Sequence, residues 1–487
     1  MALTEREKIA HLYRRFSFGG TVAEIEAGVA VGLDGTIKKL IDYDTVPQNV
    51  TAHPYEFAFK EKEEAEFGIY RFRLWWVLLM AASNRPAQEK LSLFWHSHFA
   101  VSDAKVEHAG LTLEYLQTLR KGANGKFGEL LKNVAKNPAM MKYLDMDRAF
   151  KGHPNENFAR EVMELFTMGI GNYTEKDVQE LSRALTGWGY IDTFWQGGKD
   201  NTERLMTIYR DKRPSGAFCY FPTMRDTEPK TILGQTKDFD GDQALDMLAA
   251  RPETARYMTK KLWEFYAYKN PEPAIIDRLA GVWNKTGGDI KQILLSIARS
   301  PEFYSDKCYL KHYKSPADYV MGTVRQMGLG ESILALRDKG ANPTTPIPQK
   351  VIDHLAYMQY LMFKMGLDLC YPNDVNGWKW GEEWVSPSMM TYRMQYHGMM
   401  IWDEKSQPWY AARNTQSQML AKAPTTGAEA KKRLYEIFDL HISPSADQVF
   451  QKVFDSNPMA YKDAPAWSGQ LYLCLKLLSA CPDMHVC

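Results

Sequence analysis

The segment NENFAREVMELFTMGIG, residues 155–171, indicates most directly which kind of fold this chain adopts. Its apolar residues Phe158, Val162, Leu165 and Phe166 recur at the three- and four-residue spacing of one helix face. The segment then stays apolar and ends in glycines, as expected of a helix that runs inward and stops. It therefore predicts an amphipathic α-helix packed on a core.

The same helical periodicity continues in both directions from this segment. Near the start of the chain, Thr4 with Glu7 and Thr21 with Glu24 have the spacing of a capping box, which predicts two helix starts. We find no alternation of strands and helices and no repeat of fixed period. The sequence therefore predicts an all-α fold, a large multi-helix globular body.

One stretch departs from this pattern. Residues near 188–240 are rich in Gly, Thr, Tyr and Phe and predict a small β-hairpin and loop insertion. We therefore expect three regions: an N-terminal helical region at 1–187 that carries the candidate site, the irregular insertion at 188–240, and a C-terminal helical region at 241–487 packed against the first.

Composition excludes several function classes. The 487 residues carry 60 Lys and Arg against 59 Asp and Glu, a formal net charge of +1, so no basic footprint for nucleic acid is present. No apolar run reaches the roughly 18 residues of a membrane span. The first residues lack the apolar core of a signal peptide, which favours the cytoplasm, with an exported mature form as the alternative.

The first chemical candidate is the run FWHSHF, residues 94–99, with His96 and His98. Side chains two residues apart on a helix point about 200° away from each other, so the two imidazoles converge only if the helix ends near His96. An HxH pair in an extended segment is a common metal-binding arrangement. Asp145, in a polar stretch further on, is a candidate oxygen ligand. The alternative is a helix end with one imidazole hydrogen-bonded in the core.

The second candidate is the acidic side of the helix predicted at 155–171. Glu156, Arg160 and Glu164 share one face, and Glu161 lies about 100° away from them. If the helix runs inward, these carboxylates become partly buried and need partners, a metal or raised pKa values. The alternative is a buried structural network in which Arg160 clamps Glu156 or Glu164. The sequence leaves both interpretations open.

A third feature is the aromatic loop CYPNDVNGWKWGEEWVSP, residues 370–387. Long aromatic loops in a helical body often serve as lids or binding loops. Such loops also cover apolar core, and both interpretations stay open.

Several blocks resemble a known family. They include HLYRRFSFGG at 11–20, LFWHSHFAVS at 93–102, residues 151–188 and PNDVNGWKWGEEWVSPS at 372–388. With these blocks the chain resembles the large uncharacterised bacterial family catalogued as domain of unknown function 1800. The resemblance implies no established activity. It implies a protein partner from a neighbouring uncharacterised exported family, and it places His96 and His98 within the family's pattern.

The leading functional hypothesis from the sequence is a metal-dependent hydrolase. In it a divalent ion is bound by His96, His98, Asp145 and one of the glutamates, a remaining glutamate acts as general base, and Arg160 orients a carboxylate or the substrate. The first alternative is a non-catalytic binding or assembly protein whose Glu/Asn/Arg helix is a buried structural network. A second is a glycan-acting enzyme with two carboxylates and no metal. The residues proposed as catalytic are Glu156, Arg160, Glu161 and Glu164.

Overall fold

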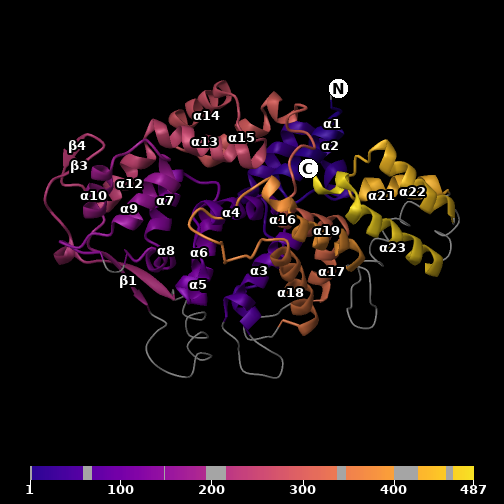
Figure 1. Ribbon diagram of the computed structural model, residues 1–487, viewed down its shortest axis with the longest axis horizontal. Helices are drawn as coiled ribbons and strands as arrows, with labels where there is room; N and C mark the ends of the chain where they lie inside the picture. Colours follow the sequence, from indigo (N-terminus) through magenta and orange to yellow (C-terminus); the bar gives the residue numbers. More distant parts are fainter. Residues whose placement is uncertain are drawn as a thin grey trace.

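The computed structural model describes residues 3–58, 68–146, 149–192, 215–336, 347–399, 426–456 and 464–487. Helices make up most of the described chain, and the β-strands lie toward one end of the long axis, with α21–α23 at the other (Figure 1). This confirms the predicted all-α fold with a small β insertion. Among the described residues no helix is long and apolar enough to cross a membrane.

Both predicted capping boxes are present at the start of the chain. Thr4 and Glu7 cap α1 (Glu5–Phe16), and Thr21 and Glu24 cap α2 (Val22–Ile41). In each box the threonine hydroxyl accepts from the backbone N–H three residues on, while the glutamate accepts from the threonine N–H.

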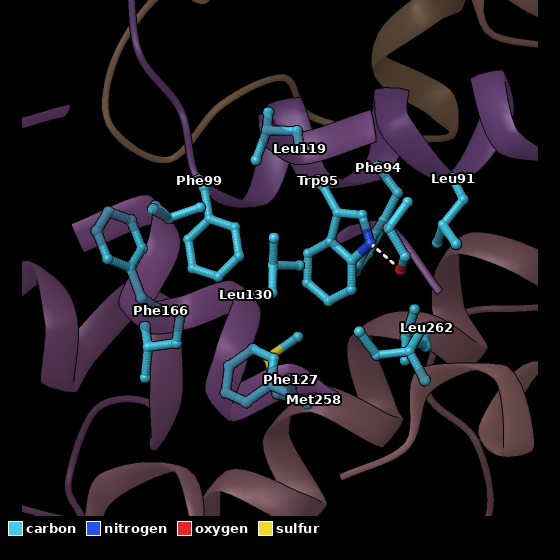
Figure 2. Close-up of a cluster of buried hydrophobic side chains, with 14 of the residues drawn as sticks. Leu91, Phe94, Trp95, Phe99, Leu119, Phe127, Leu130, Phe166, Met258 and Leu262 are labelled. Atoms are coloured by element: carbon cyan, nitrogen blue, oxygen red, sulfur yellow. Dashed lines mark hydrogen bonds between the residues drawn. The ribbon is translucent and has the colours of Figure 1, made fainter. Parts of the chain in front are cut away.

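The helix α4 (Pro86–His98) lies inside the molecule, and all of its side chains are buried. On one side it faces a hydrophobic core formed with α6 (Ala109–Gly122), α7 (Phe127–Ala135) and α13 (Pro252–Tyr266). Figure 2 shows Trp95 of α4 and Phe99, the residue that follows the helix, within this core. The Trp95 indole donates a hydrogen bond to the carbonyl of Ala123, at 2.8 Å, so its polar atom is satisfied.

A second hydrophobic core lies around α3 (Ile69–Ala82), α16 (Pro316–Gln326) and α18 (Gln349–Lys364). The apolar helix α3 is buried along nearly its whole length. Its run of apolar residues therefore belongs to the protein core. The two cores draw on residues on both sides of the predicted boundaries, and the division at 188 and 240 stays a prediction about folding units.

Two ion pairs tie the buried α4 to its neighbours. Glu89 accepts from Arg120 of α6, at 2.6 Å, and from the Trp76 indole of α3, at 3.0 Å. Lys90 pairs with Asp318 of α16, and both side chains are about 95% buried. Buried charges are tolerated only when paired, so these contacts fix which helices surround α4.

The other helices complete the two halves of the molecule. They are α5 (Asp103–Val106), α8 (Pro138–Tyr143), α9 (Glu156–Glu161), α10 (Glu175–Ala184), α12 (Gly241–Ala249), α14 (Pro273–Thr286), α15 (Ile290–Ala298), α17 (Leu329–Leu336), α19 (Pro387–Met399), α21 (Gly427–Ile437), α22 (Pro444–Ser456) and α23 (Ala464–Ala480).

The β insertion consists of two antiparallel pairs within the predicted stretch. Strand β1 (Trp188–Asp192) pairs with β2 (Gly216–Tyr220), and β3 (Lys230–Ile232) pairs with β4 (Gln235–Lys237). Part of the predicted insertion, residues 193–214, lies outside the described residues.

We expect Lys90→Met to lower the free energy of unfolding by about 3–5 kcal/mol, because it leaves the Asp318 carboxylate buried without its partner. The second change Asp318→Asn should recover part of this loss, since it removes the stranded charge. The control is Lys38→Met, which breaks an exposed pair with Asp34 and should cost at most about 1 kcal/mol. Urea unfolding measures all three, and equal losses for the two lysine variants would contradict the account.

Candidate functional site

The last turn of α4 decides where the two predicted metal ligands point. The helix continues through His98, and its C-cap residue Phe99 still donates to the Trp95 carbonyl at 2.8 Å. With both residues helical, the imidazoles of His96 and His98 diverge around the helix axis. The expected convergence of these imidazoles is therefore wrong, because it required the helix to end near His96.

His96 faces the second hydrophobic core. Its ring stacks on Trp76 of α3, with centroids 5.6 Å apart, and lies 5.2 Å from the ring of Trp378. Burial lowers the pKa of His96 to about 4, so the imidazole is neutral at physiological pH. Its Nδ1 is buried without a hydrogen-bond partner.

His98 faces a different part of the molecule. Its Nε2 lies 3.2 Å from the carbonyl of Phe166 and must donate, since a carbonyl only accepts. Burial, together with the nearby Lys261 ammonium, places the pKa of His98 well below its ordinary value. In the neutral ring Nδ1 therefore carries a lone pair, and this atom is buried without a partner.

The aromatic loop at 370–387 is fastened to the same turn of α4. The hydroxyl of Ser97 accepts from the backbone N–H of Trp378 at 3.0 Å and donates to its carbonyl at 3.3 Å. Gly377 has a φ of +75°, and a Cβ at this position would lie 2.0 Å from the Ser97 carbonyl oxygen. Only glycine fits both the backbone conformation and the close approach.

The helix α13 brings lysines to the other side of this loop. Lys260 is exposed and lies 4.0 Å from Glu264. Lys261 is partly buried, lies 5.3 Å from the centre of the Tyr257 ring, and has no ion pair with any described residue. Burial lowers the pKa of Lys261 to about 8, and the nearby Glu264 offsets only part of this effect.

A pocket of about 520 Å³ lies between α4, α13 and the aromatic loop. Its wall combines four lysines with two glutamates, so cationic groups outnumber anionic ones, and aromatic rings form much of the remainder. The lining residues are Phe94, Ser97, His98, Lys260, Lys261, Glu264, Phe265, Lys269, Asn270, His312, Asn376, Trp378, Lys379, Trp380 and Glu383.

Another pocket, of about 440 Å³, lies beside the start of α2. Its two arginines are already paired, Arg325 with Glu24 at 2.8 Å and Arg433 with Glu436 at 3.0 Å. The pocket between α4, α13 and the aromatic loop differs, because Lys261, Lys269 and Lys379 have no acidic partner among the described residues. The pocket between α4, α13 and the aromatic loop is therefore the better candidate site.

The predicted acidic helix lies at the surface rather than in a dry interior. It begins as α9 and continues as the π-helical turn η4 (Val162–Thr167). Glu156 is exposed. Arg160 forms a bidentate ion pair with Glu175 of α10, with N–O distances of 2.6 and 2.7 Å. The expectation that Arg160 clamps Glu156 or Glu164 in a buried network is therefore wrong, because α10 supplies an acidic partner at the surface.

Glu161 and Glu164 remain half-buried. Glu164 accepts a hydrogen bond from the Tyr173 hydroxyl at 2.6 Å. The pKa of Glu161 is raised by burial and then by the negative charges of Glu164 and Asp374, against the opposing effect of Arg160. Asp374 belongs to the aromatic loop, so the charge of this loop acts on the acidic helix while other loop residues line the lysine pocket.

Asp145, the third predicted metal ligand, pairs with Lys105 of α5 at 2.8 Å, and half of its side chain is exposed. In the described part of the chain, no group of three or more His, Cys, Asp or Glu side chains is arranged to hold a metal ion. The structure therefore does not bring the predicted ligands together as one metal site.

Comparison with known proteins supports the resemblance seen in the sequence. The family model described as "Protein of unknown function (DUF1800)" matches residues 11–486, nearly the whole chain. The chain belongs to the DUF1800 family. No curated protein and no solved structure showed significant similarity to this DUF1800 protein.

The sequence pointed to only part of the pocket of this DUF1800 protein. His98 and the aromatic loop were selected from the sequence, and both line the pocket. The sequence does not single out the lysines of α13, although Lys260 and Lys261 directly precede the apolar run Leu262-Trp263. A charged pair on the edge of an apolar helix face is common on protein surfaces, so this signal was weak.

We expect Gly377→Ala to destabilise this DUF1800 protein more than Gly171→Ala does. Both glycines have a positive φ, but a Cβ at Gly171 meets nothing within 4 Å, so that variant measures backbone strain alone, roughly 1–2 kcal/mol. At Gly377 the added methyl also displaces the loop from Ser97. Urea unfolding gives the two losses, and equal values would show that the loop does not depend on this contact.

Proposed function

We propose that this protein binds an anionic small molecule, or the anionic group of a larger one, in the pocket between α4, α13 and the aromatic loop. The observation that carries the proposal is the set of lysines without acidic partners that line the pocket. A concave wall with an excess of one charge sign concentrates ions of the opposite sign, because field lines focus in a cleft.

The aromatic residues indicate that the ligand also presents a flat or apolar face. Trp380 lines the pocket and its ring lies 4.8 Å from that of Phe265, edge to face. Aromatic faces of this kind stack on sugar rings and other flat groups. An anion attached to a ring therefore matches the wall better than a simple ion does.

Buried polar atoms without partners support a ligand-binding role. His98 Nδ1 and Trp378 Nε1 belong to residues that line the pocket, and neither has a hydrogen-bond partner. Native structures leave few buried polar atoms unsatisfied, and each exception calls for an explanation such as a bound water or ion.

Titration with three probes tests the proposal: inorganic phosphate, glucose and glucose 6-phosphate, followed by tryptophan fluorescence. We expect glucose 6-phosphate to bind most tightly, because it alone offers both an anion and a ring. Lys261→Met should weaken this binding about tenfold or more, as the loss of a hydrogen bond to a charged group predicts. Binding should also weaken as the pH rises above 8, where Lys261 loses its charge.

The matched control is Lys285→Met, which removes an exposed lysine of α14 outside the pocket and should leave binding unchanged. The proposal fails if none of the three probes shows saturable binding. It also fails if glucose binds as tightly as its phosphate.

Hydrolysis by acid–base chemistry is the second candidate function, and the state of Glu161 favours it. A carboxyl group whose pKa is raised by burial and by neighbouring carboxylates is suited to proton transfer. The metal-dependent form of this hypothesis stays a prediction and requires a ligand set without His96, which faces Trp76.

Glu161→Gln tests whether the fold disfavours the charged form of this carboxyl group. We expect the variant to be more stable than the wild type at pH 7, because the charged form is disfavoured in the fold. The gain should vanish below about pH 4, where the carboxyl is protonated in both folded and unfolded states. Glu156→Gln, an exposed control on the same helix, should have little effect. A loss of stability in Glu161→Gln at pH 7 would assign Glu161 a structural role.

A further inference from the structure

We propose that Lys261 is a nucleophilic amine that forms an imine with a carbonyl group on the anionic ligand. This inference rests on the proposed function, since the pocket must first hold the anion. It goes further by assigning a covalent step and a ligand class, anionic aldehydes and ketones.

The position of Lys261 differs from that of the other lysines in the pocket. Lys260, Lys269 and Lys379 are exposed, whereas Lys261 is partly buried and lies beside the Tyr257 ring. It has no ion pair with a described residue, and the nearby Glu264 offsets only part of the effect of burial on its amine. A lysine that is desolvated in an apolar setting becomes a better nucleophile, because more of its amine is neutral. The pKa of about 8 agrees with this geometry.

The neighbouring lysines share the work of binding the anion. Exposed lysines on three segments attract it, and the partly buried Lys261 adds to this attraction when charged and reacts when its amine is neutral. The titratable and charged groups that line the pocket around Lys261 are His98 of α4, Lys260 and Glu264 of α13, Lys269 after it, His312 before α16, and Lys379 and Glu383 of the loop.

The proposed step balances without an oxidant or a metal. The neutral amine of Lys261 attacks the carbonyl carbon, a C–N bond forms, and the carbonyl electron pair moves to oxygen. The nitrogen then loses both of its protons in turn, the oxygen gains two protons and leaves as water, and a neutral C=N bond remains. The Lys261 ammonium lowers the pKa of His98, but His98 Nδ1 is buried, so the protons pass between nitrogen and oxygen through solvent.

Borohydride trapping tests the proposal on the full chain. The protein is incubated at pH 8 with pyridoxal 5′-phosphate, an anionic aldehyde, reduced with sodium borohydride and mapped by peptide mass spectrometry. We expect Lys261 to be labelled at least tenfold faster than the exposed Lys285. Inorganic phosphate should slow the labelling of Lys261, and pyridoxal without its phosphate should label it more slowly.

Two variants complete the experiment. Lys261→Arg keeps a positive charge but cannot form a stable imine, so it should remove the fast label and still bind inorganic phosphate, whereas Lys260→Arg should keep the fast label. This inference is overturned if the protein still binds phosphate but Lys261 is labelled no faster than Lys285. The proposed function would then still stand. Absence of phosphate and glucose 6-phosphate binding overturns both.

Discussion

The structure depends on α4 being buried on every side while remaining helical up to His98. Each step along a helix turns the side chain by about 100°, so the residues of one turn must satisfy different neighbours. Trp95 enters the first core, His96 stacks on Trp76, Ser97 holds the aromatic loop, and His98 reaches Phe166 (Figure 2 shows Trp95 and Phe166). The ion pairs of Glu89 and Lys90 secure the same helix at its other end. The pocket exists because these contacts fix one wall of it.

The aromatic loop links two sets of charged groups that the fold keeps apart. Lysines of α13 and of the loop line the pocket, while Asp374 of the same loop stands near Glu161 of α9. The pKa of Lys261 is lowered and that of Glu161 is raised, and burial is the first cause in both cases. Groups whose environments oppose their charged forms in this way mark sites of acid–base or nucleophilic chemistry more often than surface ion pairs do. This contrast supports the proposed chemistry of the site.

Local signals in the sequence predicted the fold well. The capping boxes of Thr4 and Thr21 and the apolar spacing at Phe158 and Val162 act within one helix turn, and the structure contains the helices they predicted. The arrangement of the site was harder to predict, because it depends on where α4 ends and on which distant segment meets it. The sequence predicts a metal site shared by His96 and His98, but His98 instead bonds to the carbonyl of Phe166. Arg160 pairs with Glu175 of α10. Lys261 was harder to find, since the sequence shows only a charged pair before an apolar run, and the pocket forms from segments far apart in the chain.

The measurement that tests the account most directly is anomalous X-ray diffraction from crystals grown with selenate, an anion with a strong selenium signal. If the pocket is an anion site walled by α4 and the aromatic loop, a selenium peak will lie within hydrogen-bonding distance of Lys261 in well-ordered density. If selenate occupies only exposed lysines elsewhere, or if side chains fill the pocket, the central claim is contradicted.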